Sequence, residues 1–161
     1  MDRLFNPWRM DYIQSARGGG DDECLFCDLL RSEDEDVYVL TRTSHAFVVM
    51  NVYPYNPGHL LVAPIRHTGA LEDLEPEELS QTGELLQQSV GVLQAEMSPG
   101  GFNVGMNLGR VAGAGVPGHL HWHVVPRWNG DANFMAVTSE TRLLPELVVD
   151  TYKKLRPHFN R

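Results

Sequence analysis

The stretch HLHWHVV at residues 119–125 alternates histidine with apolar residues at a strict period of two. Successive side chains of a β-strand point to opposite faces, so this alternation predicts a strand over residues 119–125. The three imidazoles would then lie on one face, about 6–7 Å apart. Leu120, Trp122 and Val124 would face the core. We expect this strand to carry the functional site.

A row of histidines on one strand face has three interpretations. It can be a solvent-exposed face that carries histidine by chance. It can be a three-histidine metal site, because imidazole is a frequent zinc ligand and catalytic zinc usually has three protein ligands. It can also contain a nucleophile, in which one imidazole attacks phosphorus while a neighbour holds its tautomer.

A glycine-rich loop, NLGRVAGAGVPG at residues 107–118, leads directly into the histidines. Glycine lets backbone N–H groups approach an anion closely and form a nest around it. A loop of this kind joined to the histidine row favours phosphorus chemistry.

Four more segments have the short, β-branched and aromatic character of strands, and turn residues separate them. They are residues 37–40, 46–50, 59–63 and 102–108. A helix is predicted from Glu75-Pro76 to the stop at residues 98–101, with apolar residues at steps of three and four. Its apolar positions are Leu79, Leu86, Val90, Leu93 and Met97.

A final helix is predicted near residues 144–156, with one face formed by Leu144, Leu147, Val148, Thr151 and Leu155. Hairpin-like strands with inserted helices predict an α+β fold, in which two main helices cover one side of a mainly antiparallel five-stranded sheet.

The composition excludes several classes of protein. A chain of 161 residues with 42% hydrophobic content suits one domain, which we place at residues 21–161 after an N-terminal arm at residues 1–20. The net charge of −8 argues against a nucleic-acid-coating role. No apolar run approaches the roughly 20 residues of a membrane span, and the start lacks the apolar core of a signal peptide. The two cysteines cannot form a disulfide framework, so we expect a cytoplasmic protein. From the charge and the lack of an apolar run, we expect no nucleic-acid or membrane partner.

The segment Cys24-Leu25-Phe26-Cys27 has the spacing of a zinc knuckle. A redox dithiol is an alternative, but it would normally open a helix after a strand in a thioredoxin-like unit, which is absent here. Two ordinary buried thiols are a third possibility.

The motif His-x-His-x-His followed by two apolar residues resembles the histidine triad (HIT) family of nucleotide hydrolases and transferases. The resemblance runs from Cys24 to about Phe134, and NVYPYNPGHLLVAP at residues 51–64 looks like the family's first strand–turn–strand segment. PRWNGDANF at residues 126–134, together with PWRM at residues 7–10, is similar to the bacterial diadenosine tetraphosphate phosphorylase-like branch. The resemblance implies a HIT-like fold whose sheet continues across a homodimer, with the long helix at the interface.

The resemblance also implies a role for each matching residue. His121 would attack the α-phosphorus and form a nucleotidyl-histidine, which water or phosphate then resolves. Imidazole suits this step because it is nucleophilic when neutral and leaves readily when protonated. His123 would contact phosphate and help orient its neighbour. Asn51 would hold the ribose hydroxyls, Asn107 would contact phosphate, and His59 would lie near the site.

The loop before the triad departs from the pattern of many relatives, which carry Ser, Thr or Gln there. AGVPG at residues 114–118 offers no side-chain hydroxyl or amide. Phosphate contacts would have to come from backbone N–H groups, for which we expect Gly113, Gly115 and Val116. The net charge of −8 repels a polyanion, so its binding must depend on such local donors.

Some bacterial members of the family bind zinc through a cysteine pair, a histidine after a Pro-x-x-His step, and the first triad histidine. The matching residues are Cys24, Cys27, His67 and His119. The resemblance therefore implies a structural zinc that ties the N-terminal segment to the catalytic strand. As a ligand, His119 could not serve as the leaving-group acid.

We therefore expect an enzyme that cleaves dinucleoside polyphosphates at the α-phosphate, by phosphorolysis or hydrolysis. A purine nucleoside phosphoramidase of the same family is the first alternative. A zinc-stabilised nucleotide-binding module without turnover is the second, and a metal hydrolase that uses all three histidines is the third.

Overall fold

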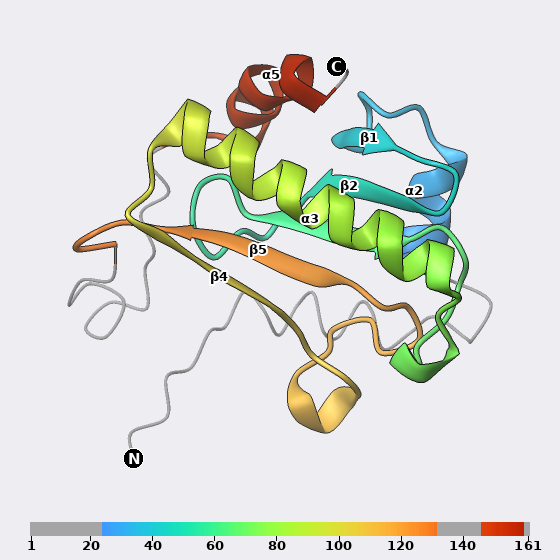
Figure 1. Cartoon of the computed structure of the whole chain (residues 1–161). Helices are drawn as coiled ribbons and strands as arrows, with labels where there is room; N and C mark the ends of the chain where they lie inside the picture. Colours follow the sequence, from blue (N-terminus) through green and yellow to red (C-terminus); the bar gives the residue numbers. More distant parts are fainter. Residues whose placement is uncertain (1–23, 132–145, 160–161) are drawn as a thin grey trace.

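The computed structural model describes residues 24–131 and 146–159, and its central element is a five-stranded sheet in the order β1-β2-β3-β5-β4 (Figure 1). All neighbouring strands are antiparallel. The strands are β1 (Val39–Arg42), β2 (Ala46–Met50), β3 (Leu60–Pro64), β4 (Gly101–Met106) and β5 (Trp122–Arg127). The helices are α2 (Leu25–Arg31), α3 (Pro76–Met97) and α5 (Val148–Phe159). The expected α+β fold is confirmed. The expected N-terminal arm at residues 1–20 lies outside the described residues.

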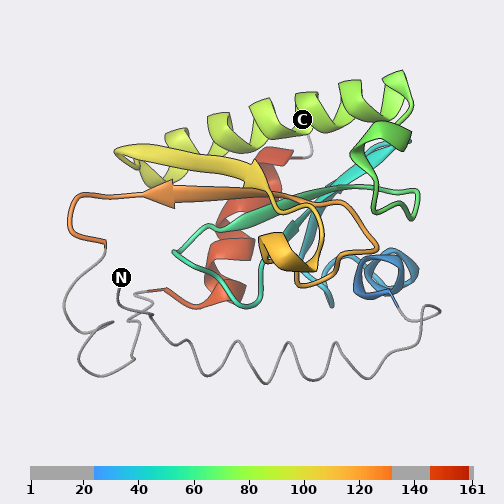
Figure 2. The same cartoon turned by 90° about the horizontal axis from the view of Figure 1, so that it is seen from below.

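The two faces of the sheet carry separate apolar clusters. Helices α3 and α5 pack on one face, over a core that includes Leu40, Val48, Val62, Val124 and Leu155. The sequence analysis predicted helices on this face of the sheet only. Helix α2, which was not predicted, covers part of the opposite face (Figure 2) through a second cluster: Cys24, Phe26, Val39, Phe47, Val49 and Ala63.

Helix α3 begins as predicted, because Glu75 and Glu78 form a capping box and Pro76 occupies the first turn. It ends at Ser98, which adopts the left-handed conformation with φ 47°. The predicted inward face was partly wrong, since Leu79 is 52% exposed. The buried positions of the helix are Glu78, Thr82, Leu85, Ser89 and Leu93. Three of these five residues are polar, so a search for apolar periodicity does not find this face.

Helix α5 occupies residues 148–159 rather than 144–156. Its buried residues are Thr151, Tyr152, Leu155 and Phe159, whereas the predicted face member Leu147 is 68% exposed. Leu144 lies outside the described residues. No helix in the described part of the chain is long and apolar enough to cross a membrane.

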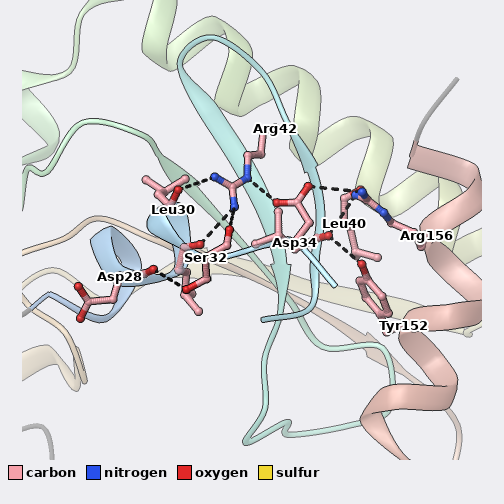
Figure 3. A network of polar contacts seen from close by, with 10 residues as sticks. Asp28, Leu30, Ser32, Asp34, Leu40, Arg42, Tyr152 and Arg156 are labelled. Atoms are coloured by element: carbon pink, nitrogen blue, oxygen red, sulfur yellow. Dashed lines mark hydrogen bonds and ion pairs between the residues drawn. The ribbon is translucent and has the colours of Figure 1, made fainter. Parts of the chain in front are cut away.

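The carboxylate of Asp34 joins β1, α5 and the segment after α2 (Figure 3). It accepts from Arg42 Nε at 2.6 Å and from Arg156 at 3.4 Å. Arg42 also donates to the Leu30 carbonyl at 2.7 Å, and Arg156 donates to the Leu40 carbonyl. Two cations around one carboxylate therefore hold α2 and α5 to the same edge strand.

Candidate active site and metal cluster

The histidine row begins before the strand that was predicted to carry it. Strand β5 starts at Trp122, so only His123 of the three lies within it. The Leu120 N–H donates to the Thr68 carbonyl at 2.7 Å, which holds the preceding segment against the loop after β3. The side chains still alternate. Leu120 and Val124 are buried, and the rings of His121 and His123 lie 5.2 Å apart between centroids.

His121 is held as a neutral imidazole in one tautomer. Its Nδ1 lies 2.8 Å from the backbone carbonyl of His119, and a carbonyl oxygen can only accept, so Nδ1 carries the proton. The lone pair is then on Nε2. The side chain is 7% exposed, and burial lowers the pKa of His121 below its ordinary value although the carbonyl contact opposes this. A neutral imidazole with a defined lone pair is the form that attacks an electrophile.

A second histidine, His59, fixes the tautomer of His123. The backbone N–H of Tyr55 donates to His59 Nδ1 at 3.0 Å, so the proton of neutral His59 is on Nε2. His59 Nε2 lies 2.9 Å from His123 Nδ1 and donates to it. His123 then carries its own proton on Nε2. This relay makes His123 Nε2–H a hydrogen-bond donor.

Asn51 lies at the entrance to the β2–β3 loop and supports this relay. Its Oδ1 accepts from the Tyr53 N–H at 2.9 Å, and its Nδ2 lies 3.3 Å from His59 Nδ1. The structure thus brings Asn51 and His59 together beside His123. Both were implied near the nucleotide, and both hold the loop and the ring next to the site.

Phe26 is a residue of the site that the sequence analysis did not identify. It is 1% exposed, and its ring centroid lies 4.8 Å from that of His121 and 5.1 Å from that of His119. It also packs edge-on against Phe47 at 6.3 Å. Because Phe26 lies between the two cysteines, helix α2 brings both the thiols and this ring to the histidine row. Its only signal in the sequence was its position within C-x-x-C.

Four predicted metal ligands converge at the end of the row. The Sγ atoms of Cys24 and Cys27 and one ring nitrogen each of His67 and His119 lie within 4.8 Å of one another. Cys24 Sγ is 3.3 Å and Cys27 Sγ is 3.8 Å from His119 Nδ1. Cys27 Sγ is 3.5 Å from His67 Nδ1. Tetrahedral zinc, with bonds of about 2.3 Å to sulfur and 2.0–2.1 Å to nitrogen, separates such ligands by about 3.5 Å.

The protonation of His119 also fits a metal. Its Nε2 donates to the Pro64 carbonyl at 2.8 Å, which leaves the lone pair on Nδ1, the nitrogen that faces the thiols. Burial lowers the pKa of His119 to about 4, so the ring is neutral. Burial raises the pKa of Cys27, with contact to Cys24 as a further cause, so in the absence of a cation this thiol stays protonated. Four soft or imidazole donors in this arrangement match a structural zinc site.

The three triad histidines do not form a converging set of metal donors among the described residues. His119 faces the cysteines, His121 Nδ1 donates to a carbonyl, and His123 Nδ1 accepts from His59. Within the described ranges, the Cys24–Cys27–His67–His119 group is the one whose donor atoms converge. The geometry therefore favours the nucleophile over a three-histidine metal hydrolase.

The glycine-rich loop folds around a short 3₁₀ turn, η2 (Arg110–Ala112). Gly109 and Gly113 flank the turn with φ of 79° and 96°, which side-chain-bearing residues rarely adopt. Asn107 Nδ2 donates to the Gly113 carbonyl at 3.4 Å. The Gly113 N–H donates to Arg110 O at 3.0 Å, within the turn itself. Of the three expected backbone donors, Gly113 thus already has a partner.

A groove of about 370 Å³ opens beside the last histidine of the row. Its lining includes His123 near the start of β5 and Arg127 at the end of that strand, together with Asn107, Tyr55 and Asn103. The Tyr55 and His123 rings are nearly parallel, at 15° with centroids 5.8 Å apart. Neither His121 nor Asn51 is among the described residues that line it. The groove therefore continues the row on the side opposite the metal cluster.

Comparisons with known proteins agree with this geometry. A family model described as HIT domain matches residues 32–130. The chain is 38% identical over 167 aligned positions to AP-4-A phosphorylase of Mycobacterium tuberculosis, covering 100% of this chain and 86% of that protein. It is 38% identical over 95 positions to the asymmetrical bis(5'-nucleosyl)-tetraphosphatase of Schizosaccharomyces pombe, covering 59% of this chain and 50% of that protein.

Solved structures show the same fold. A Zn-bound histidine triad family protein from Mycobacterium smegmatis superposes with a TM-score of 0.69 at 26% identity, covering 88% of this chain and 96% of that one. A HIT family protein from Bacillus anthracis superposes with a TM-score of 0.59 at 29% identity, covering 66% and 74%.

Proposed function

The chain belongs to the HIT domain family, and from this membership we propose that it is an enzyme that cleaves dinucleoside polyphosphates through His121. The observation that carries the proposal is the hydrogen bond from His121 Nδ1 to the His119 carbonyl. It puts the lone pair on Nε2 of a buried, neutral ring. The 38% identity to a protein named AP-4-A phosphorylase supports this class of substrate.

The first step is attack of His121 Nε2 on the α-phosphorus. A nitrogen–phosphorus bond forms, and the bond from phosphorus to the bridging oxygen breaks. The departing nucleotide leaves with that electron pair, as a phosphate anion. The ring becomes cationic, which makes it a good leaving group when phosphate or water attacks the intermediate. Nδ1–H continues to donate to the His119 carbonyl during this step, so the developing charge is stabilised by a fixed dipole.

His123 and the loop bind the phosphate oxygens. The relay through His59 keeps a proton on His123 Nε2, which donates to a phosphate oxygen. The Gly113 N–H is used within its own turn, so we assign the backbone contacts to Gly115 and Val116, supported by the Asn107 amide. These are neutral donors, which suits a chain whose own charge is −8. Asn51 holds the ribose hydroxyls from the loop that also carries His59.

We further propose that Cys24, Cys27, His67 and His119 bind one zinc ion. The fit rests on the lone pair of His119 Nδ1, on thiol–imidazole distances of 3.3–3.8 Å, and on a donor set that zinc prefers. A bound zinc would supply a cross-link between α2 and the segment that precedes β5. As a ligand, His119 contributes to catalysis only through its backbone carbonyl, not as an acid.

We also propose that two copies pair through β4. This strand is at one edge of the sheet, and Asn103, Val104 and Gly105 within it are exposed. Pairing of two such edges satisfies their backbone groups and extends the sheet. A mass of two chains in light scattering supports this arrangement, and a mass of one chain contradicts it.

A product assay with diadenosine tetraphosphate, with and without inorganic phosphate, tests the proposed reaction. Release of ADP that requires phosphate indicates phosphorolysis, and release of AMP without phosphate indicates hydrolysis. His121→Asn should abolish turnover and leave nucleotide binding within about threefold, because the side chain acts on the transition state rather than on the ground state. Full activity of this variant would refute the mechanism.

A further inference from the structure

We propose that Cys24 and Cys27 are a redox-sensitive pair, which a peroxide converts to a disulfide, with release of the metal and loss of turnover at His121. The inference rests on the proposed metal site, and its effect on turnover rests on the proposed function. The chain has two cysteines in total, so this is the one disulfide that a single chain can form. From the sequence, a redox dithiol was an alternative to a zinc knuckle. The positions of the two side chains suit both roles.

The two cysteines lie one helical turn apart. Cys24 is the N-cap residue of α2, and its carbonyl accepts from the Asp28 N–H at 3.0 Å, so it already belongs to the first turn. Residues three apart in a helix have Cα atoms about 5 Å apart, within the roughly 4.4–6.8 Å that a disulfide spans. The two Sγ atoms lie within 4.8 Å of one another. Rotation of the side chains can therefore close the bond without movement of the helix.

The two thiols differ in their access to a small oxidant. Cys24 is buried, with 7% of its surface exposed, whereas Cys27 is half-buried and lies beside the exposed His67. Redox-sensing cysteines are solvent-accessible and lie next to a second cysteine that resolves the first oxidation product. We therefore assign the reaction with peroxide to Cys27 and the closure of the disulfide to Cys24.

Hydrogen peroxide is the oxidant in this step. The Cys27 thiolate attacks one peroxide oxygen, the O–O bond breaks, and hydroxide leaves as Cys27 becomes a sulfenic acid. The Cys24 thiolate then attacks the Cys27 sulfur, the S–S bond forms, and a second hydroxide leaves. The two sulfurs have lost two electrons to the peroxide, and solvent protons convert both hydroxides to water. Because a thiolate is the form of cysteine that binds a metal, the pair no longer provides two ligands and the cation passes to solvent.

Oxidation replaces a long-range cross-link by a local one. The metal ligands join Cys24 to His119, which are 95 residues apart, whereas the disulfide closes a loop within the four residues 24–27. The stabilisation that a cross-link provides grows with the length of the loop it closes. The oxidised chain therefore loses the connection between α2 and the segment before β5 and gains little in return. We expect its Tm to fall to that of the metal-free protein.

Two contacts transmit this loss to His121. Phe26, which lies between the cysteines, has its ring centroid 4.8 Å from that of His121. The carbonyl of His119 lies 2.8 Å from His121 Nδ1, and the ring of the same His119 faces the Cys24 sulfur at 3.3 Å. Both contacts come from residues that the metal ligands hold in place. Since a small displacement of a reacting group lowers its rate steeply, oxidation should lower kcat more than it raises KM.

The experiment treats the full chain, loaded with zinc, with hydrogen peroxide. A colorimetric chelator counts the released zinc, peptide mapping by mass spectrometry locates the disulfide, and kcat is measured with diadenosine tetraphosphate and phosphate. We expect about one zinc released for each disulfide and a fall in kcat of about tenfold. Dithiothreitol and zinc should restore kcat to within about twofold, which separates the disulfide from methionine oxidation, since that lesion needs a dedicated reductase.

The matched variants are Cys27→His and Cys24→His, because each keeps four donors for zinc and neither can form the disulfide. At the same peroxide concentration, both should release zinc at least about tenfold more slowly than the unmodified chain, because the remaining cysteine has no resolving partner. Equal release from the variants, release without a Cys24–Cys27 disulfide, or a disulfide that leaves kcat unchanged would overturn the proposal. A chain that binds no zinc would overturn the metal site and this inference together. Reduced, zinc-loaded protein that fails to cleave the dinucleotide would refute the proposed function, while zinc release and disulfide mapping, which need no turnover, would still decide the redox pair.

Discussion

Removal of the metal should destabilise this protein by an amount that follows from its topology. The cluster joins Cys24 to His119, which are 95 residues apart in the chain. In the loop-entropy model, a cross-link that closes about 100 residues stabilises the folded state by up to about 4.7 kcal/mol. For a domain of this size, 1 kcal/mol corresponds to about 2–4 °C in Tm. We therefore expect chelation to lower Tm by about 10–15 °C.

The assay combines elemental analysis with calorimetric unfolding in the presence and absence of a chelator. The double variant Cys24→Ser with Cys27→Ser is the control, because it should already have the lowered Tm and should not respond to the chelator. Loss of the metal should lower nucleotide affinity less than it lowers stability. The reason is that the cluster is at the opposite end of the histidine row from the groove. About one zinc per chain is expected. Carefully purified protein without metal, or a chelator effect that persists in the double variant, would refute the reasoning.

Two further predictions concern the support of the site. The Arg66 guanidinium beside Glu78 lowers the pKa of that carboxyl to about 2 from an ordinary 4.5, so its stabilising effect is complete above pH 4.5 and is lost as the pH falls toward 2. Glu78→Gln should therefore reduce the free energy of unfolding at pH 7 by about 2 kcal/mol and much less at pH 2.5, measured by denaturant titration, and an equal loss at both pH values would contradict the prediction. Phe26→Leu should lower kcat by about tenfold with little change in KM, because its ring packs on His121, whereas Phe47→Leu, which removes a ring from the same cluster, should affect stability alone. Equal kcat values for the two variants would show that Phe26 has no positioning role.

The sheet was largely predictable because its strands follow local patterns. The predicted β2 boundaries match the observed ones, and β3 and β4 were predicted within two residues, since apolar runs bounded by turn residues reflect burial directly. Helix α2 was missed because seven residues with two cysteines have little periodicity, and the helix depends on contacts across the sheet. The inward face of α3 was misjudged for a related reason. Buried Glu78 has a hydrogen-bond partner outside the helix, and buried Thr82 has one within it. The hydrophobicity of the sequence indicates neither hydrogen bond.

The metal cluster was predictable in membership, although its four residues come from three separate parts of the chain. The spacing of the cysteines and the family resemblance were sufficient to identify all four residues of the cluster. The tautomers were beyond sequence reasoning, because they depend on which carbonyl or amide each ring meets. The Pro64 carbonyl, the His119 carbonyl and the Tyr55 amide decide where the protons lie on three histidines. Each of these partners is a backbone group, and backbone groups leave no signature in the sequence.

The acidic composition and a polyanionic substrate are compatible because the site depends little on cationic side chains. Several arginines are already engaged with carboxylates, namely Arg42 and Arg156 with Asp34, Arg66 with Glu78, and Arg127 with Asp131. Burial lowers the pKa of His119 and of His121, so these two rings are neutral. Binding of phosphate then relies on oriented N–H groups, which need no reorganisation when charge moves from the leaving oxygen to the ring. A cationic site would bind substrate and product polyphosphates equally well, whereas oriented neutral donors favour the arrangement of oxygens at the phosphorus under attack.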